Sequence, residues 1–489
     1  MDKIKVVYVA FECEPFFSTG NLGAVVGSLT NRIAKINRDE YDVNVILPLY
    51  SHINREFRNK LVYLSQITVN LSWRRQYCGI YRYEKNGVNY YFLDNEYYFK
   101  RHNLYGYFDD AERFAFFAKA SIDVMLYLNI NPNIVHAHDH MTGLVPVYMK
   151  TLYSNYNEFK NTKVVFTIHS VEFQGIYALD DDIICDVFGL PSEVKPILEY
   201  RNDLNVMKAA METADFVTTV SETFAEEILT SKYANGLEYE AQRINDEGKL
   251  TGILNGIDKT YYNPKTDKAL FAKYDRKDLT NRIINKVELQ KMLNLVVSER
   301  IPTIGIVSVL SEEKGFRDLK LILDELLLEN VQLIVLGVGD NYYEELLTHY
   351  SVNNRAKMRA VIAYNEDLAR KIFAASDIYL VPSYNEPCGL NHMLASRYGA
   401  VPIVRSVGGL KDTVVDFSNG NGNGYVFDGD SKALLETIKR ALNDYKNQEL
   451  WQKYQYRVMN VDFGWTASTK EYLKLYKKLT MNVMKEYKK

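Results

Sequence analysis

Continuous apolar runs of strand length alternate with longer amphipathic stretches through the first half of the chain. Residues 5–11 form one such run, which predicts a parallel strand buried on both faces, and the Gly-rich turn at 18–24 leads into a helix predicted from 25 to about 35. Further strands are predicted at 41–48, 133–138, 164–168 and 215–220, and further helices at 111–128 and 142–152. Ser221 is predicted to be a helix N-cap. This order of elements is typical of a doubly wound α/β domain.

The alternation breaks near residues 252–264, where a linker is predicted, and a second series of strands then begins. Its five predicted strands cover 303–309, 331–336, 358–363, 378–381 and 401–404. Period-two patches at 61–93 predict an antiparallel insertion in the first domain. We expect an α/β protein with two doubly wound, Rossmann-like domains, residues 1–255 and 256–467, facing each other across a cleft. A C-terminal helix, 468–489, is expected to cross back onto the first domain.

The composition of the 489-residue chain is that of an ordinary globular protein, with 47% hydrophobic and 25% charged residues. A formal net charge of −3 gives no electrostatic reason to expect nucleic acid or an anionic membrane as partner. No apolar run reaches membrane-spanning length, and no signal peptide is expected. The cysteines have neither zinc-site spacing nor the pattern of a disulfide framework, so a reduced, cytoplasmic setting is predicted.

Candidate chemistry is concentrated in the stretch Glu386-Pro-Cys-Gly-Leu390, which follows an apolar strand and precedes a helix. A carboxylate beside a glycine at a helix start is the usual geometry of a nucleotide-sugar site, where loop atoms and helix N–H groups meet hydroxyls and phosphates. The Gly-rich turn Ser18-Thr-Gly-Asn-Leu-Gly-Ala24 is predicted to supply the second half of this site.

Five co-linear motifs carry a resemblance to a known family. They are Val135-His-Ala-His-Asp139, Phe166-Thr-Ile-His-Ser170 with Gln174-Gly-Ile176, Gly252-Ile-Leu-Asn-Gly-Ile-Asp258, Glu386-Pro-Cys-Gly-Leu390 and Gly408-Gly-Leu-Lys-Asp-Thr413. In order and spacing they closely resemble those of bacterial glycogen synthases and plant starch synthases, from about residue 3 to about residue 480. The resemblance implies a GT-B architecture and retaining transfer of glucose from ADP-glucose to the nonreducing end of an α-1,4-glucan (glycogen, starch or a maltooligosaccharide), with no metal required.

The same resemblance assigns four residues to the reaction. Glu386 is expected to face the donor sugar, Lys314 to meet the phosphates, His169 to lie near the C6 side of the sugar, and Asp139 to lie on the acceptor side. The competing interpretation of Glu386 and of Asp139 is a carboxylate that caps a helix, and that of His169 is a satisfied core histidine.

Donor contacts are implied at a second group of positions. The resemblance places Asn255 and Gly256 near the donor and adenine stacked on Tyr364, for which a core tyrosine is the competing interpretation. The remaining donor-side positions are Gly20, Gly23, Gly389, Leu390, Gly408 and Gly409.

The chain departs from the family pattern at phosphate-handling positions. Ser18, Asn21 and Ala24 stand where the family has Lys, Gly and Asp, and Val309 stands where it has Arg. Further departures are Tyr384, Asn391 and His392. Removing one preorganised donor from such a site costs about 3 kcal/mol, or roughly a hundredfold in rate. Three hypotheses stay open: a slowed glucosyltransferase, an inactive glucan-binding or regulatory partner of an active glycogen synthase, and an enzyme with a different donor.

Three histidines, His136, His138 and His140, raise the alternative of a metal site. Alternation along a strand would place all three on one face, with Asp139 on the other. We favour a structural role, because the resembled family carries His-Ala-His-Asp without a metal.

Overall fold

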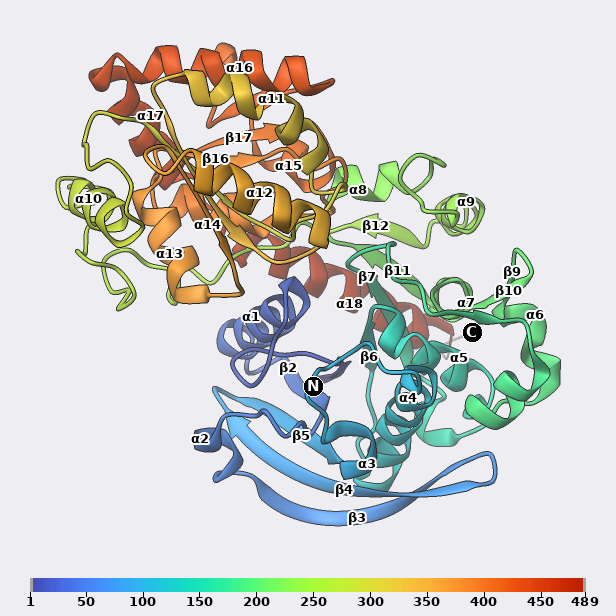
Figure 1. Cartoon of the computed structure of the whole chain (residues 1–489). Helices are drawn as coiled ribbons and strands as arrows, with labels where there is room; N and C mark the ends of the chain where they lie inside the picture. The colour runs from blue at the N-terminus through green and yellow to red at the C-terminus, as the bar shows by residue number, and fades with distance from the viewer. Residues whose placement is uncertain (1–2, 487–489) are drawn as a thin grey trace. The chain divides into compact units, whose positions relative to one another are not determined.

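The computed structural model describes residues 3–486. The chain divides into two compact units: unit 1 comprises the residues up to Gly256 together with those from Trp465 onward, and unit 2 comprises Ile257–Gly464. Each unit contains its own parallel sheet with helices (Figure 1). The prediction of two doubly wound α/β domains is confirmed.

Unit 1 is built on a sheet of nine strands in the order β12-β11-β7-β6-β1-β2-β5-β4-β3. Its parallel strands are β1 (Ile4–Val9), β2 (Tyr41–Pro48), β5 (Val88–Asp94), β6 (Ile134–His138), β7 (Lys163–Ile168), β11 (Phe216–Thr219) and β12 (Leu250–Gly252). The last four residues of β1 are fully buried, as expected of a central strand covered on both faces. The carboxyl ends of β1, β6 and β7 therefore meet at one edge of the sheet, where ligands bind in folds of this type.

The region of period-two patches, residues 61–93, contributes the outer end of this sheet. Strands β3 (Val62–Leu71) and β4 (Arg74–Lys85) are antiparallel, and β4 is antiparallel to β5. The predicted insertion is therefore correct for two of its three strands, whereas β5 also pairs in parallel with β2 and continues the main sheet. A small separate sheet contains β8 (Ile176–Ala178), β9 (Glu199–Tyr200) and β10 (Asp203–Asn205).

The predicted helices of unit 1 are present together with further ones, and the first of them begins earlier than predicted. They are α1 (Asn21–Ile36), α2 (Arg55–Arg58), α3 (Glu96–Phe99), α4 (Asp110–Tyr127), α5 (Leu144–Lys150), α6 (Lys195–Leu198), α7 (Val206–Thr213), α8 (Glu222–Glu227), α9 (Glu238–Asp246) and α18 (Thr466–Glu486). Helix α1 begins four residues before the predicted start, because Gly20 is its N-cap and Gly23 lies inside the first turn. Ser221 is the N-cap of α8, as predicted, and its side chain accepts a hydrogen bond from the Phe224 N–H.

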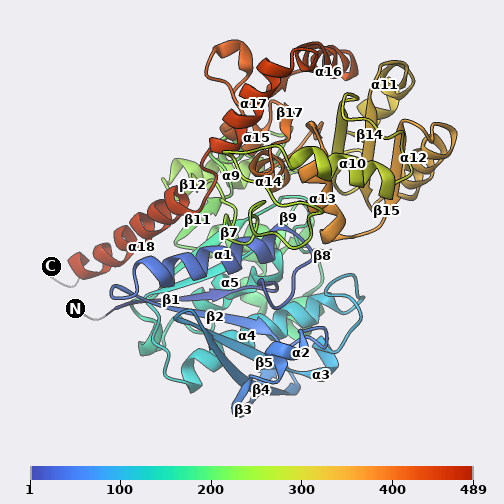
Figure 2. The same ribbon diagram turned by 90° about the vertical axis from the view of Figure 1, so that its left-hand side faces the viewer.

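Helix α18 belongs to unit 1 and contacts α1 (Figure 2). Its Tyr476 is fully buried, and the Tyr476 hydroxyl lies 2.8 Å from that of Tyr8 on β1. The predicted last helix extended to residue 489, and residues 487–489 lie outside the described part of the chain. Among the described residues, no helix has both the length and the apolar composition that crossing a membrane requires.

Unit 2 is built on a parallel sheet of six strands in the order β15-β14-β13-β16-β17-β18. The strands are β13 (Thr303–Val307), β14 (Gln332–Gly337), β15 (Met358–Ile362), β16 (Ile378–Val381), β17 (Val401–Arg405) and β18 (Tyr425–Phe427). The first five were predicted, whereas β18 was missed because three residues carry too short a pattern. This strand order is that of a dinucleotide-binding Rossmann fold.

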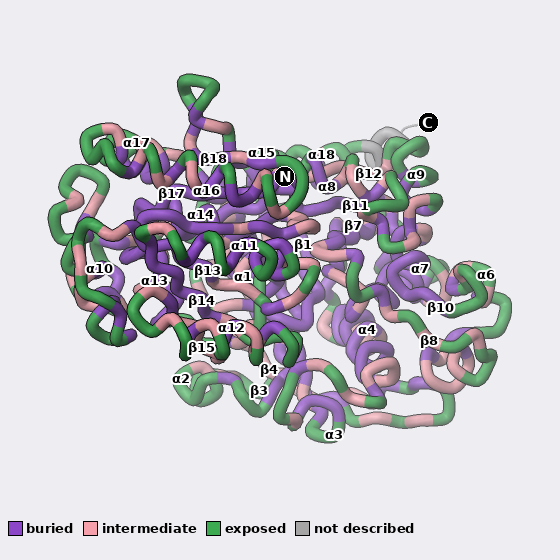
Figure 3. Tube along the Cα trace, turned by 45° about the horizontal axis from the view of Figure 1, so that its top comes forward, coloured by how far each residue is buried: buried purple, intermediate pink, exposed green. Residues whose placement is uncertain are grey.

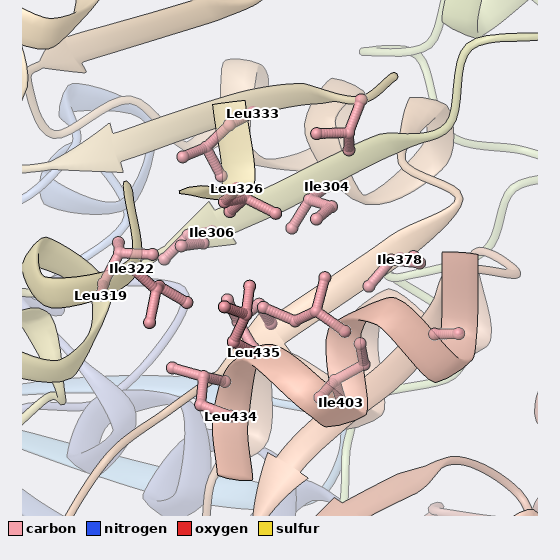
Figure 4. Close-up of a cluster of buried hydrophobic side chains, with 14 of the residues drawn as sticks. Ile304, Ile306, Leu319, Ile322, Leu326, Leu333, Ile378, Ile403, Leu434 and Leu435 are labelled. Atoms are coloured by element: carbon pink, nitrogen blue, oxygen red, sulfur yellow. The ribbon is translucent and has the colours of Figure 1, made fainter. Parts of the chain in front are cut away.

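The helices of unit 2 cover both faces of this sheet. They are α10 (Arg282–Met292), α11 (Phe316–Leu328), α12 (Asn341–Asn353), α13 (Glu366–Ala375), α14 (Leu390–Arg397), α15 (Gly408–Thr413), α16 (Ser431–Tyr445) and α17 (Gln448–Asn460). Side chains of α11 and α16, such as Leu326 and Leu434, pack against Ile304 and Ile403 of the sheet (Figure 4). The central strands are buried and the outer helix faces exposed (Figure 3), so the strand ends hold the loops that follow them on a rigid base.

Candidate active site

Glu386 lies in the loop between β16 and α14 and forms an ion pair with Lys314. Lys314 Nζ donates a hydrogen bond of 3.0 Å to Glu386 Oε2, and Ser383 Oγ donates to the same oxygen, also at 3.0 Å. Only 12% of the Glu386 side chain and 22% of the Lys314 side chain are exposed. Because the pair is largely shielded from water, its charges interact more strongly than they would on an open surface.

Glycines let the backbone pack closely around this loop. Gly408 has a left-handed φ of 43°, and a Cβ placed on it would lie 2.1 Å from the carbonyl oxygen of Glu386. A Cβ on Gly409 would lie 2.3 Å from the Cys388 carbonyl oxygen, and Gly409 N–H donates to the Glu386 carbonyl at 3.1 Å. Helix α15 therefore starts directly against the Glu386 loop, which requires both glycines.

The helix-cap interpretation of Glu386 is wrong. The N-cap of α14 is Gly389, whose φ of 76° is left-handed and which has no side chain to cap the helix. The Glu386 carboxylate instead accepts from Lys314 and Ser383. Leu390, the first residue of α14, is buried, with 5% of its surface exposed.

Two neighbouring arginines of unit 2 already have partners within the protein. Arg405 is buried and donates a hydrogen bond of 2.7 Å to Asp318 Oδ2 and one of 3.1 Å to the Pro382 carbonyl. Its guanidinium group lies 4.5 Å from the centroid of the Tyr384 ring. Arg317 is exposed and pairs with Glu312 at 3.0 Å. Val309, at the position of the family arginine, is 57% exposed and supplies no charge. Lys314 is therefore the cation in contact with Glu386.

The other substituted donor-side positions have structural partners. Asn391 Nδ2 donates to the Val307 carbonyl at 2.9 Å, and His392 Nε2 lies 2.7 Å from Thr413 Oγ1. Burial lowers the pKa of His392 to about 3, so its ring is neutral near pH 7. Both side chains thus connect α14 to its neighbours.

Tyr364 follows β15 and its side chain is 73% exposed. The core interpretation of this tyrosine is therefore wrong. Gly337 and Gly339 serve close backbone packing, because a Cβ on Gly337 would lie 1.9 Å from the Ser308 carbonyl oxygen and one on Gly339 would lie 2.3 Å from that of Leu310.

In unit 1 the Gly-rich turn leads directly into α1. Ser18 Oγ donates to the Gly20 carbonyl at 2.8 Å. A Cβ on Gly23 would lie 2.5 Å from Ser18 Oγ, so glycine is required there, whereas a Cβ on Gly20 would meet nothing within 4 Å. The turn is thus open at Gly20, and the hydroxyl of Ser18 is used within the loop.

Glu12 holds the same turn in place through hydrogen bonds to Thr19. This residue was not identified from the sequence. Its carboxylate accepts from Thr19 N–H at 2.6 Å, from Thr19 Oγ1 at 2.7 Å and from Tyr105 OH at 2.7 Å. Glu12 is 3% exposed. A carboxylate at the end of β1, before a glycine-rich turn, was the available signal, but its partner Tyr105 is 93 residues away in sequence.

Asp139 and His169 lie together at the ends of β6 and β7. Asp139 Oδ1 accepts from the His169 backbone N–H at 2.7 Å, and Asp139 has a left-handed φ of 57°. Burial, with a smaller contribution from Glu12, raises the pKa of Asp139 to about 7, against the lowering effect of hydrogen bonds from the His169 and Ser170 backbone. Its side chain makes no cap bond to the turn that follows, so the capping interpretation is wrong.

A buried row of rings supports His169. His169 Nε2 lies 3.0 Å from His138 Nδ1, and the His138 ring stacks on His136 at 4.3 Å between centroids. His136 Nδ1 lies 2.7 Å from Tyr476 OH, and His136 Nε2 lies 2.6 Å from Thr167 Oγ1. Burial lowers the pKa of His136 and His169 to about 3, so this row is uncharged near pH 7. Helix α18 is thereby connected to the ring that is expected to face the sugar.

The metal alternative is not supported by this geometry. His136 and His138 share a face, but the strand ends at His138, and His140 lies in the following short 3-10 turn (His140–Thr142), against Phe114. The prediction that all three histidines share one face is therefore wrong. Among residues 3–486, no group of three or more His, Cys, Asp or Glu side chains could hold a metal ion.

Asn255 and Gly256 end unit 1 after β12. Asn255 is 3% exposed, and its Oδ1 has no hydrogen-bond partner among the described residues. Its backbone N–H donates to the Val220 carbonyl at 3.3 Å. A buried amide oxygen without a partner is costly and is typical of a group that awaits a ligand or water.

The predicted residues therefore form two constellations. In unit 2 the chain brings together Glu386, Lys314 and the glycines Gly389, Gly408 and Gly409. In unit 1 it brings together Asp139 and His169, with the Glu12-held turn close enough to affect Asp139.

Comparisons with known proteins show the family to which the chain belongs. Residues 5–242 match the model of the starch synthase catalytic domain, and residues 268–458 match that of glycosyl transferases group 1. A glycogen synthase of Caldicellulosiruptor bescii is 41% identical, covering 97% of this chain and 99% of the relative, and one of Bacillus subtilis is 40% identical over 98% of each.

A solved structure is similar over nearly the whole chain. It is the catalytic domain of starch synthase IV from Arabidopsis thaliana bound to ADP and acarbose, with a TM-score of 0.90 and 29% identity, covering 98% of this chain and 100% of that one. A sucrose-phosphate synthase of Thermosynechococcus elongatus, with a TM-score of 0.62 and 18% identity, shares the fold. From the full-length relatives, the matching family models and the two constellations together, this chain belongs to the family of glycogen and starch synthases, glycosyltransferases of the GT-B fold.

Proposed function

We propose that this protein transfers glucose from ADP-glucose to the nonreducing end of an α-1,4-glucan with retention of configuration, and that it turns over more slowly than relatives with a complete set of phosphate-binding cations. The observation that carries the proposal is the shielded pair of Lys314 and Glu386, held by Ser383 and seated against Gly408 and Gly409. The binding of ADP and acarbose by the starch synthase neighbour supports a nucleotide donor and a glucan acceptor.

The chemistry follows from the charges that develop as the glycosidic bond to ADP breaks. Negative charge grows on the departing diphosphate, and the ammonium of Lys314 is the cation placed to meet it. Positive charge grows on the sugar ring, and the Glu386 carboxylate offsets it. Because both groups are held by protein contacts before substrate arrives, little reorganisation is needed at the moment of reaction.

On the acceptor side Asp139 is the group suited to meet a glucan hydroxyl. With its pKa raised to about 7, the carboxyl is close to half ionised at neutral pH and can accept a proton or donate a hydrogen bond. His169 is neutral, because its pKa is lowered to about 3, so it offers the sugar a hydrogen-bonding ring without charge. No step in this scheme calls for a metal.

Turnover is reduced in this proposal because two cations are missing. Ser18 and Val309 replace the Lys and Arg that the family carries, and the nearby Arg405 is engaged with Asp318. If each loss costs about 3 kcal/mol and the losses add, the rate falls by roughly ten-thousandfold. The same deficit favours a second candidate function, a glucan-binding partner of an active glycogen synthase that does not itself transfer glucose.

Incorporation of labelled glucose into glycogen separates the two functions. The purified protein is incubated with ADP-glucose or UDP-glucose and glycogen, beside its Glu386→Gln variant. The proposal predicts slow incorporation from ADP-glucose that the variant lacks, with the label at nonreducing chain ends in α-1,4 linkage. Incorporation no greater than that of Glu386→Gln, together with calorimetric binding of maltooligosaccharides, would support the partner function instead.

A further inference from the structure

Unit 2 contains a cavity that shares no residue with the Glu386 loop. It has a volume of about 410 Å³ and is lined by the segment after the unit boundary, by the turn around Arg276, and by the ends of α14 and α17. Arg397, the last residue of α14, lines it, whereas the first residue of the same helix follows the donor loop. Its size suits a small metabolite.

The lining of this cavity is strongly cationic. Five basic residues line it, Lys259, Lys265, Arg276, Lys277 and Arg397, against a single acidic one, Asp275. Clustered charges of one sign in a concave wall raise the local concentration of counter-ions. The cavity is therefore suited to an anion.

Only part of this charge is neutralised within the protein. Lys259 pairs with Asp462 at 2.7 Å, and Lys265 lies 3.4 Å from Asp275. Arg276 donates a 2.9 Å hydrogen bond to the neutral amide of Asn460. Within residues 3–486, neither Arg276 nor Arg397 has a carboxylate within ion-pair distance, which leaves two guanidinium groups on the cavity wall without an anionic partner.

Of the two arginines, Arg397 is in the less favourable environment. Its Nε–H is buried and has no hydrogen-bond partner among the described residues. Burial and the charge of Arg276 lower the pKa of Arg397, against smaller raising effects of Tyr398 and of Asp462, which itself pairs with Lys259. A bound anion would relieve both effects, because it would accept a hydrogen bond from the unpaired Nε–H and offset the repulsion between the two guanidinium groups.

We propose that this cavity binds a phosphorylated small molecule through the guanidinium groups of Arg276 and Arg397, at a site separate from the donor loop. The planar guanidinium matches phosphate oxygens in a bidentate manner, which favours phosphate over a monovalent halide. Inorganic phosphate, a sugar phosphate and a nucleotide share this chemistry, and the volume accommodates each of them. The inference does not depend on whether the donor site is catalytically active.

The test is calorimetric titration of the full-length protein with inorganic pyrophosphate, glucose 6-phosphate and AMP at constant ionic strength, with chloride as the screening control. The variants are Arg276→Gln, which is exposed and leaves the core intact, and Arg397→Gln, with melting temperatures measured for both. Arg355→Gln, an exposed arginine of the same unit outside the cavity, is the matched control, and Lys314→Gln reports binding at the donor loop.

At least one phosphorylated probe is expected to bind the wild-type protein and to bind Arg276→Gln roughly tenfold more weakly or worse, with Arg355→Gln and Lys314→Gln unchanged. The relative affinities of the three probes then identify the source of the phosphate. Binding that is lost in Lys314→Gln and retained in Arg276→Gln would place the anion at the donor loop and overturn the proposal. Equal weakening by Arg355→Gln, equal binding of chloride, or no binding of any probe would also overturn it.

Discussion

Replacing Lys314 by Ala is expected to lower kcat far more than it lowers stability. The substitution removes the 3.0 Å contact between Nζ and Glu386 Oε2 and leaves that oxygen with the Ser383 hydroxyl. Because the pair retains 12–22% side-chain exposure, water can partly replace the lost partner, and we expect a destabilisation of about 1 kcal/mol. The departing diphosphate would lose its preorganised cation, at about 3 kcal/mol of barrier, which is a fall in kcat of roughly a hundredfold or more.

Two measurements on the same preparations check this expectation. Labelled-glucose incorporation at saturating ADP-glucose gives kcat, and urea denaturation gives the free energy of unfolding. Lys320→Ala is the matched control, because Lys320 lies on α11, the helix that follows Lys314, and has an exposed side chain. A kcat for Lys314→Ala within threefold of the wild-type value, with the fold intact, would show that Lys314 does not meet the leaving group.

Three further substitutions test other parts of the account. Gly408→Ala should lower the free energy of unfolding, measured in urea, by about 2 kcal/mol or more, because the new Cβ would meet the Glu386 carbonyl. Gly420→Ala is the control: with a φ of 75° and nothing within 4 Å of its Cβ, it should cost about 1 kcal/mol. Equal destabilisation by the two substitutions would contradict the close packing at Gly408. Tyr476→Phe should cost about 2 kcal/mol, because the Tyr8 hydroxyl and His136 Nδ1 lose their buried partner. The exposed Tyr456→Phe should change nothing in the same assay, and an unchanged stability of Tyr476→Phe would refute the ring row. Because the folded pKa of Asp139 is raised to about 7, its protonated form favours folding, and this contribution is lost as pH rises from about 4 through 7. Asp139→Asn should flatten the fall in unfolding free energy over that window, and an identical pH profile in wild type and variant would exclude the raised pKa.

Sequence patterns predicted most of the parallel strands of both sheets, because buried parallel strands are nearly continuous apolar runs. The strands at Tyr41–Pro48 and Ile378–Val381 have the predicted bounds. Elements defined by tertiary pairing were not predictable: β18 has three residues, and β5 pairs with β2 on one side and β4 on the other. The start of α1 was predicted too late, because a glycine such as Gly23 is unusual inside a helix. Here Gly23 lies in the first turn, where the absence of a side chain leaves room for Ser18.

Family motifs located the candidate site residues, but the contacts that hold them required coordinates. The resemblance named Glu386 and Lys314, whereas their 72-residue separation gave no local sign that they pair. Glu12 was missed because its role depends on Tyr105, and the alternation rule failed at His140 because the strand ends two residues earlier. Local pattern thus predicted the scaffold, and long-range contacts determine the chemistry.

The central claim is that missing positive charge, at positions otherwise built to receive a leaving diphosphate, limits turnover. The most direct measurement compares glucose incorporation from ADP-glucose by the wild-type protein with that by a Ser18→Lys, Ala24→Asp, Val309→Arg variant of equal thermal stability. The account predicts a gain of about a hundredfold or more in kcat for the variant, since restoring each cation lowers the barrier by about 3 kcal/mol and part of the gain is lost to imperfect geometry. If the triple variant incorporates glucose no faster than the wild-type protein, the account is contradicted.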